Sequence, residues 1–185
     1  MRDIRRAIRD YVPRCGQEEK DRVFILDFLA RNPDAFLREN PVAHMTASAW
    51  VVNPARDKVL MVYHRIYDSW SWTGGHADGD EDLAAVALRE VKEETGVKSA
   101  RLVSDDILSL EVLTVDGHEK RGEYVSSHLH LNVTYLVEAD EHDALTVCEE
   151  ENSGVRWFTP EEALRASTEP WFVERIYKKL VDRTA

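Results

Sequence analysis

The start of the chain carries a helical pattern of apolar residues. These residues recur at helical spacing, with breaks near Pro13 and Gly16 that separate two short amphipathic helices. After Pro41 the apolar positions alternate with polar ones or run together, as they do in strands. The pattern therefore predicts a helical N-terminal extension over residues 1–42 and a main domain over residues 43–185.

Strands and helices alternate along the main domain. Two strand-like segments flank residues 53–57, whose residue types favour a turn, so we expect a hairpin there. Between residues 82 and 95 the chain is rich in Ala, Leu and Glu at helical spacing, and Gly96 stands where a helix often ends. The expected elements are hairpin strands at 44–52 and 58–63, a helix at 82–95, strands at 107–115, 126–138 and 155–158, and helices that begin near Pro160 and Pro170.

The composition is that of an ordinary globular protein with an acidic balance. The 185 residues are 43% hydrophobic, and 24 Lys and Arg stand against 35 Asp and Glu, for a net charge of −11. This balance disfavours a general electrostatic attraction to nucleic acid or to an anionic membrane. The two cysteines form no metal or redox motif, and we find no secretory signal or membrane-spanning stretch. We therefore expect a cytoplasmic protein whose partner is neither nucleic acid nor a membrane.

Three carboxylates stand close together on the predicted helix. Glu90, Glu93 and Glu94 occupy positions i, i+3 and i+4. They repel one another, and the C-terminal end of a helix already carries partial negative charge. An acidic segment is often only a solvated face. A divalent cation would relieve the repulsion, however, and oxygen ligands favour Mg²⁺, with Mn²⁺ as the alternative.

The segment around these carboxylates resembles a known motif. Residues 75–97, GHADGDEDLAAVALREVKEETGV, fit the Nudix box, G-x5-E-x7-R-E-U-x-E-E-x-G-U with U aliphatic, at every fixed position. The matching residues are Gly75, Glu81, Arg89, Glu90, Val91, Glu93, Glu94, Gly96 and Val97. The resemblance extends over roughly residues 43–185 and implies an α/β/α sandwich around a mixed β-sheet. It also implies a metal-dependent hydrolase that acts on a nucleoside diphosphate linked to another group.

The resemblance also implies roles for the residues of the box. Glu90 and Glu94 are expected to be the principal Mg²⁺ ligands, with Glu93 as a further ligand and the carbonyl of Gly74 or Gly75 completing the shell. Glu81 and Arg89 are expected to form an ion pair that orients the loop and the helix, and Gly96 is structural. Arg89 thus supports catalysis indirectly.

A carboxylate must also accept the proton of the attacking water. Members of the family place this general base in the box or in a later loop. Glu93 is therefore a candidate within the box, and Glu150 and Glu151 are candidates in the acidic loop. A solvated loop carboxylate is the alternative interpretation of Glu151.

Candidate substrate-binding residues are less sharply defined. In residues 128–134 the polar side chains, including His128 and His130, alternate with apolar ones, so they line a cleft or a solvated face. A zinc site at this histidine pair is disfavoured, because the sequence places no Cys or further His convincingly beside it. Further candidates are Arg121, His76, which follows Gly75, and Trp72, for which core packing is the alternative.

Two other functions stay open. A Nudix-like domain can sense nucleotides without cleaving them, and a diphosphate isomerase shares the fold. The complete set of box carboxylates argues against the sensor, and the positions of Cys15 and Cys148 argue against the isomerase. The N-terminal helices are expected to pack on the domain or on the mate in a homodimer.

Overall fold

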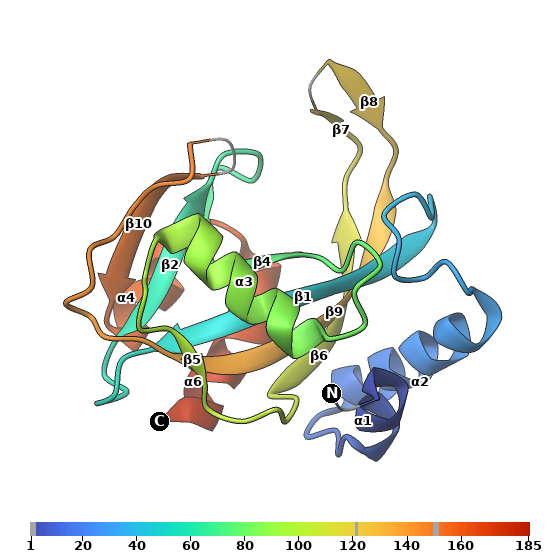
Figure 1. Ribbon diagram of the computed structural model, residues 1–185, viewed down its shortest axis with the longest axis horizontal. Helices are drawn as coiled ribbons and strands as arrows, with labels where there is room; N and C mark the ends of the chain where they lie inside the picture. The colour runs from blue at the N-terminus through green and yellow to red at the C-terminus, as the bar shows by residue number, and fades with distance from the viewer. Residues whose placement is uncertain (1–2, 121, 150–151) are drawn as a thin grey trace.

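A mixed β-sheet organises the chain. In the computed structural model, which describes residues 3–120, 122–149 and 152–185, the long strands β1 (Ala43–Val52) and β9 (His128–Glu138) run parallel at its centre (Figure 1). Strands β2 (Val59–His64) and β4 (Thr73–His76) pair antiparallel with β1. The sheet is completed by β3 (Ser69–Ser71) and β10 (Asn152–Phe158) on β2, and by β5 (Arg101–Leu102) and β6 (Ser109–Val115) on β9.

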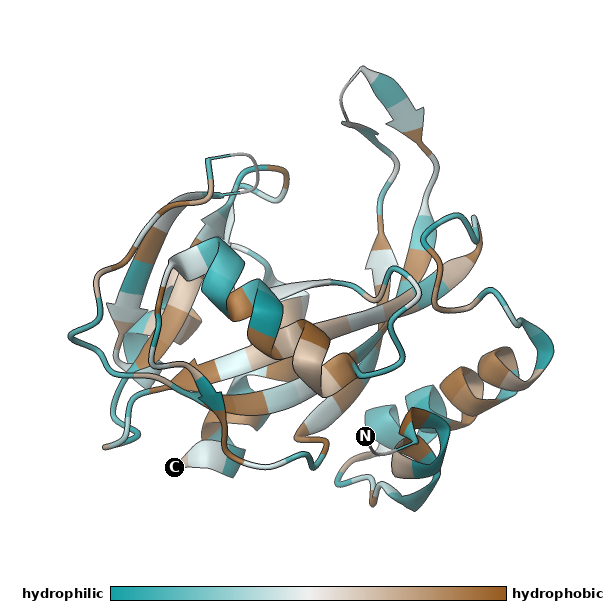
Figure 2. Cartoon of the chain, viewed as in Figure 1, coloured by the Kyte–Doolittle hydropathy of each residue, from teal (hydrophilic) through white to brown (hydrophobic). Residues whose placement is uncertain are grey.

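Helices cover both faces of this sheet, which is why every residue of β1 is buried. Met45, Ala47 and Val51 contribute to the core beneath helix α3 (Leu83–Thr95), and Trp50 and Val52 belong to a second apolar cluster. That second cluster includes side chains of α4 (Pro160–Ala166), α5 (Pro170–Phe172), the π-helical turn η1 (Val173–Tyr177) and α6 (Lys178–Thr184). Brown, apolar segments recur along these strands in Figure 2. The predicted α/β class with a mixed sheet is confirmed.

The N-terminal helices are part of the same folded body. Helices α1 (Ile4–Asp10) and α2 (Gly16–Arg31) contribute Ile8 and Ile25, both fully buried, to the core that also contains α3. Two helices were expected here, but α2 is longer than the short helix predicted. The two parts share one core. The division of the chain at residue 42 stays a prediction.

Most of the predicted elements are present. The hairpin β1–β2 forms, and α3 begins after Asp82, whose side chain accepts a hydrogen bond from the backbone N–H of Ala85 at 3.1 Å. Gly96 ends α3 in the left-handed conformation, with φ +73°, as predicted. The short strands β4 and β5 were not predicted as strands, nor was the hairpin of β7 (His118–Lys120) and β8 (Glu123–Val125), which projects away from the body (Figure 1). None of the helices in the described residues has both the length and the apolar character needed to cross a membrane.

Candidate active site

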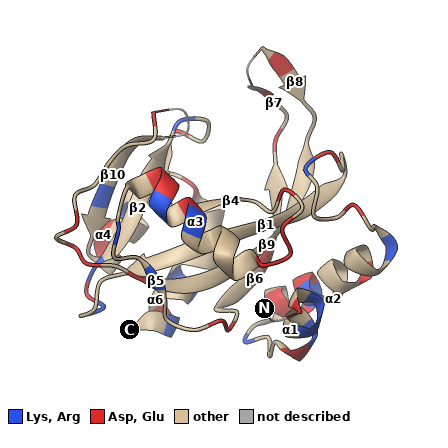
Figure 3. Cartoon of the chain, in the orientation of Figure 1, with Lys and Arg blue, Asp and Glu red and all other residues tan. Residues whose placement is uncertain are grey.

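Helix α3 is joined to strand β4 by Glu94. This side chain is only 3% exposed, and its Oε1 accepts a hydrogen bond from the backbone N–H of Gly74 at 2.8 Å. Asn152, on β10, donates from Nδ2 to the backbone carbonyl of Glu94 at 3.0 Å. Two separate elements, β4 and β10, therefore fix the position of the last turns of α3, where the acidic residues gather (Figure 3).

The two glycines of β4 allow a very close approach of neighbouring atoms. A Cβ atom at Gly75 would lie 2.4 Å from Cδ of Glu90 and 2.6 Å from each of its carboxylate oxygens. A Cβ atom at Gly74 would lie 2.5 Å from Oγ of Ser48 and 2.7 Å from the carbonyl oxygen of Ala47. Glu90 therefore rests directly on the backbone of β4, and the strand itself lies against β1.

The three predicted metal ligands differ in depth. Glu94 is buried, Glu90 is half-buried and Glu93 is exposed to solvent. Among the described residues, these carboxylates do not form a group of three whose ligand oxygens all lie within 4.8 Å of one another. A closed protein cage is not what Mg²⁺ requires, because it usually keeps several waters and binds one or two carboxylates together with substrate phosphates. The oxygen donors of Glu90 and Glu94 beside the β4 backbone fit Mg²⁺ or Mn²⁺ in that mode.

The loop before α3 is held by the N-terminal extension. Arg38 donates two hydrogen bonds to the carboxylate of Asp78, one of them from Nε at 2.6 Å, and these bonds lower the pKa of Asp78. Gly79 donates its backbone N–H to the carbonyl of Phe36 at 2.9 Å. Arg38 was not predicted from the sequence, because no sequence pattern links Arg38 to the box.

The expected ion pair between Glu81 and Arg89 is replaced by pairs with other partners. Nη1 of Arg5, on α1, lies 2.8 Å from Oε2 of Glu81. Nη1 of Arg89 lies 3.5 Å from Oδ2 of Asp80, the residue just before Glu81. All of these side chains are at least one-third exposed. The box loop is thus connected to α3 through Asp80 and to the N-terminal extension through Glu81.

Four histidines gather at one end of the central strands. His44 is on β1 beside its register partner His130 on β9, His128 is on the same face of β9, and His76 ends β4. The ring centroid of His44 lies 5.0 Å from the centroids of His76 and His130 and 4.9 Å from the centroid of His128. The ligand nitrogens of His44, His76 and His130 all lie within 4.8 Å of one another. Three of these histidines were predicted from the sequence to bind substrate, and His44 was not predicted.

Hydrogen bonds define the tautomers of two of these rings. Nδ1 of His44 lies 3.2 Å from the carbonyl oxygen of Asn40, and Nδ1 of His128 lies 2.8 Å from that of Ser126. A carbonyl oxygen only accepts, so each Nδ1 carries a proton, and in the neutral form of the ring Nε2 presents a lone pair. Nε2 of His128 lies 3.2 Å from Nε2 of His130.

Burial keeps His44 and His130 uncharged. Burial, reinforced by the neighbouring histidines, lowers the pKa of His130 to about 2. Burial also lowers the pKa of His44, whose side chain belongs to a residue only 3% exposed. At neutral pH these two rings are therefore neutral.

Beyond the histidines, the polar face of β9 is buried and internally bonded. Oδ1 of Asn132 accepts hydrogen bonds from Thr46 Oγ1 at 3.0 Å and from Ser48 Oγ at 2.9 Å. Its Nδ2 donates to Oε2 of Glu111 at 3.3 Å, and Thr134 is fully buried. This part of the strand is therefore neither a solvated face nor an open wall of a cleft.

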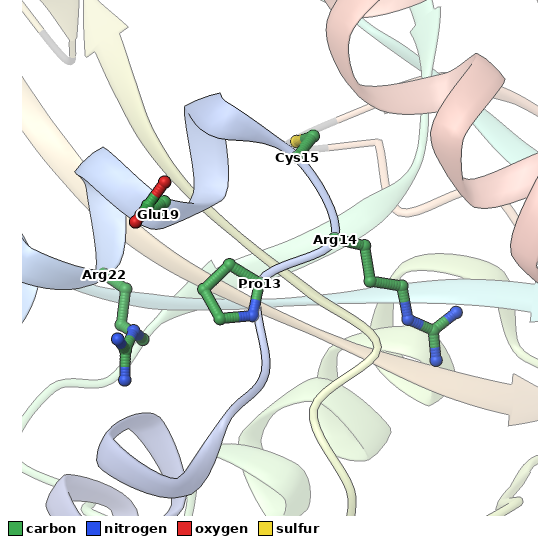
Figure 4. A pocket seen from close by; sticks show the side chains of 5 residues that line it. All are labelled: Pro13, Arg14, Cys15, Glu19 and Arg22. Carbon is green, nitrogen blue, oxygen red and sulfur yellow. The ribbon is translucent and has the colours of Figure 1, made fainter.

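The remaining candidates lie elsewhere. Trp72 is 8% exposed and packs edge-on against Tyr177, with ring centroids 5.7 Å apart, so little of its ring is exposed for a substrate. Arg121 and Glu151 lie outside the described residues, as does Glu150. A separate surface pocket lies at the junction of α1 and α2 and contains none of the predicted site residues (Figure 4); it is lined by Pro13, Arg14, Cys15, Glu19 and Arg22.

Comparison with curated proteins finds several partial matches. The chain is 32% identical to Nudix hydrolase 27, chloroplastic, of Arabidopsis thaliana over 82 residues, which are 44% of this chain and 36% of that protein. It is 27% identical to the probable DHNTP pyrophosphohydrolase of Lactococcus lactis subsp. cremoris over 57% of this chain and 60% of the relative. It is 28% identical to the asymmetrical bis(5'-nucleosyl)-tetraphosphatase of Rattus norvegicus over 51% of this chain and 58% of the relative. The chain thus spans between 36% and 60% of the length of these relatives.

Solved structures and a family model agree on the fold. An Ap4A hydrolase of C. elegans, 19% identical, superposes with a TM-score of 0.53 over 75% of this chain and 93% of that one. The MutT protein of Methanosarcina mazei, 20% identical, gives a TM-score of 0.54 over 78% of this chain and 96% of its own. The model of the NUDIX domain matches residues 42–180. Since this match includes the whole box and most of the chain, the chain belongs to the NUDIX domain family.

Proposed function

We propose that the protein is a metal-dependent pyrophosphohydrolase that cleaves a phosphoanhydride bond in a nucleoside diphosphate linked to another group. The observation that carries this proposal is the placement of two carboxylates of the box against strand β4, at Gly74 and Gly75. Glu94 accepts the N–H of Gly74, and Glu90 covers Gly75. Two relatives are named for nucleotide-derived substrates, the DHNTP pyrophosphohydrolase and the bis(5'-nucleosyl)-tetraphosphatase, which supports this substrate class.

The reaction requires a nucleophile, a cation that neutralises the charge of the phosphates, and a base. The oxygen of water forms a bond to phosphorus, the anhydride P–O bond breaks, and the proton of the water passes to a carboxylate. Glu90 and Glu94 would hold Mg²⁺ or Mn²⁺, with Glu93 and the carbonyl of Gly75 as further ligands. When bound, the cation neutralises charge on the phosphate oxygens and lowers the barrier to attack.

The residues of the site have distinct roles. The hydrogen bond from Gly74 keeps Glu94 in one orientation, and the pair Arg89–Asp80 positions α3 against its loop. Glu93 is exposed on the same helix and is one candidate for the base that accepts the proton. Glu151, which precedes β10 in the sequence, is the other.

The proposal is tested by separating and quantifying the nucleotide products formed from a panel of substrates. The panel contains nucleoside triphosphates, ADP-ribose, NADH, nucleotide sugars and dinucleoside polyphosphates, each with and without Mg²⁺ or Mn²⁺. Glu94→Gln retains an oxygen that can accept the Gly74 N–H but removes the charge, so we expect folded protein without turnover. Glu161→Gln, at an exposed position on α4, is the matched control and should retain full turnover. Nucleotide binding without cleavage of any substrate would favour the sensor instead.

The identity of the base is tested separately. Glu93→Gln and Glu151→Gln are compared with wild type at saturating Mg²⁺. The variant that loses the base should lose about 10²–10⁴-fold in kcat, and the other should lose much less. Equal, small losses in both variants would exclude both residues as the base.

A further inference from the structure

We propose that His44, His76, His128 and His130 form a second metal site, which binds Zn²⁺ or a similar cation that prefers imidazole nitrogen. This site is separate from the carboxylates of the box. It goes beyond the hydrolase function and does not depend on it.

Strand pairing brings these histidines together. Parallel pairing of β1 with β9 sets His44 beside His130, and antiparallel pairing of β1 with β4 sets Thr46 opposite His76. Side chains two residues apart on a strand share a face, so His128 and His130 point the same way, as do His44 and Thr46. Three strands therefore direct four imidazoles to one place, although the residues are widely spaced in sequence.

The distances are suited to a single cation. Zinc binds imidazole nitrogen at about 2.0–2.1 Å, and in a tetrahedral site two ligand atoms then lie roughly 3.3 Å apart. The Nε2 atoms of His128 and His130 are 3.2 Å apart. Ligand nitrogens of His44, His76 and His130 lie within 4.8 Å of one another. His128 is not in this group of three, so side-chain rotations are needed to bring it in, beside His130, as the fourth ligand.

The unpaired Nε2 of His44 indicates that a bound group belongs at this cluster. Nε2 of His44 is buried and has no hydrogen-bond partner among the described residues. An unpaired buried acceptor costs free energy, about 1–3 kcal/mol, unless something binds it. Nδ1 of the same ring donates to the carbonyl of Asn40, so Nε2 is the nitrogen whose lone pair remains available to a cation.

The outer contacts of the cluster are those of a metal site. Histidines that bind metals usually donate their other N–H to a backbone carbonyl or a carboxylate, which fixes the tautomer and orients the ring. Asn40 supplies this carbonyl to His44, and Ser126 supplies it to His128. The nearby carboxylate of Asp78 is already held by Arg38, so it is not needed as a ligand.

The donor set defines the class of cation. Neutral imidazoles suit Zn²⁺, Ni²⁺, Co²⁺ and Cu²⁺ and are poor ligands for Mg²⁺. Four protein ligands leave no open position, which is typical of a structural rather than a catalytic zinc site. A cation here would connect β1, β4 and β9 one residue away from Gly75. It would therefore stabilise the strand on which Glu90 rests.

The test is the metal content of the full-length chain. Protein stripped with a chelator is dialysed against Zn²⁺ alone and against Zn²⁺ with excess Mg²⁺, and bound zinc is measured by elemental analysis. We expect one Zn²⁺ per chain that excess Mg²⁺ does not displace, together with a higher thermal unfolding midpoint. Co²⁺ in place of Zn²⁺ should give the visible absorption of a tetrahedral site.

Variants locate the bound zinc. His76→Gln and His130→Gln should each lose it, and His142→Gln, at an exposed loop position, should retain it. His76→Gln is the decisive variant, because this half-exposed side chain is easier to replace without unfolding, which circular dichroism checks. Glu94→Gln should keep the zinc even though it lacks turnover, so failure of one proposal is distinguishable from failure of the other.

Two results would overturn the proposal. One is a wild-type chain that binds no stoichiometric zinc after stripping. The other is zinc that persists in folded His76→Gln and His130→Gln, because the metal would then be bound elsewhere.

Discussion

Gly75 is the residue at which the sequence motif and the packing of the site meet. The motif requires glycine at the start of the box, and the structure gives a reason, since the carboxylate of Glu90 occupies the space of a side chain there. The backbone of β4 and the carboxylate are in direct contact. Any side chain at this position must displace Glu90 or bend the strand.

Gly75→Ala is therefore expected to reduce turnover strongly. The new methyl group would lie within 2.6 Å of the Glu90 carboxylate, so this carboxylate must rotate away from β4. We expect at least about a tenfold loss in kcat, which is the lower end of the effect of disturbing a metal ligand through its neighbours. Formation of the nucleotide product and urea unfolding are measured together, to separate misplacement of Glu90 from loss of the fold.

Gly16→Ala is the matched control for this change. A Cβ atom there would meet nothing within 4 Å, and the residue begins helix α2. Alanine forms helices better than glycine by up to about 1 kcal/mol, so the control should be neutral or slightly stabilising, with unchanged turnover. If Gly75→Ala kept full turnover, contact between β4 and Glu90 would have no part in catalysis.

The histidine cluster is a feature that could not be predicted from the sequence. Glu90, Glu93 and Glu94 are recognisable because a helix brings residues i, i+3 and i+4 together. The spacing of His44 from His130 has no such rule. Their proximity depends on the parallel register of β1 and β9, which is set by the whole sheet.

The loop before α3 depends on elements outside the box. Arg38, from the segment between α2 and β1, makes two hydrogen bonds to Asp78, which has a positive φ of 49°. Left-handed backbone is unfavourable for a residue with a side chain, so the loop needs such contacts to keep its shape. The N-terminal extension thus supports the box from outside.

We predict that Arg38→Gln lowers activity more than stability. The pair with Asp78 is about half exposed, so its loss should cost no more than about 1 kcal/mol of unfolding free energy. Turnover should fall roughly tenfold, because the loop that leads into α3 loses its anchor. Arg31→Gln, which breaks the exposed pair with Asp27, is the control and should change neither quantity. Equal activity in the two variants would argue against support of the loop by Arg38.

Helices α2 and α6 are joined by a buried ion pair. Arg183 donates from Nη1 to Oε1 of Glu18 at 2.6 Å and from Nη2 to Oε2 at 2.9 Å. Nζ of Lys179 lies 3.1 Å from Oε1 of Glu18 and 2.8 Å from Oε1 of Glu111 on β6. Both carboxylates are fully buried, so each depends on these cations.

Arg183→Gln should destabilise the protein strongly. Removal of one partner leaves the buried charge of Glu18 poorly compensated, which typically costs about 3–5 kcal/mol. Urea unfolding monitored by circular dichroism measures the loss. Arg165→Gln, which removes an exposed partner of Glu161, should shift the unfolding free energy by less than about 1 kcal/mol. A loss in Arg183→Gln as small as in the control would mean that water solvates the network.

Over the whole molecule, the sequence predicted local order better than long-range order. The helix at 82–95, its end at Gly96 and the hairpin of β1 and β2 follow from periodicity and turn chemistry, and the structure confirms them. Short strands such as β4 were not recognised as strands, because Thr73–His76 is too short to show alternation. The contacts of the N-terminal extension with the box were also missed, since Arg5 and Glu81 are brought together only by tertiary packing.

The buried network also determines how the molecule responds to acid. Burial raises the pKa of Glu18, but the hydrogen bond from Arg183 and the other contacts outweigh burial and lower the pKa from 4.5 to about 2. A carboxylate with a lowered pKa in the folded state contributes its full stabilisation above its unfolded pKa. That contribution disappears as the pH falls from about 4.5 to about 2.

Comparison of wild type with Glu18→Gln isolates this contribution. The buried histidines titrate in both chains, so only the difference in unfolding free energy is interpreted, and it is measured in chelator at several pH values. At pH 7 wild type should be more stable by roughly 3 kcal/mol, because each unit of pKa shift corresponds to about 1.4 kcal/mol. The difference should stay constant down to about pH 4.5 and then shrink as Glu18 begins to bind protons. A difference that is unchanged between about pH 6 and pH 3 would show that the charge of Glu18 is not what stabilises the junction of α2 and α6.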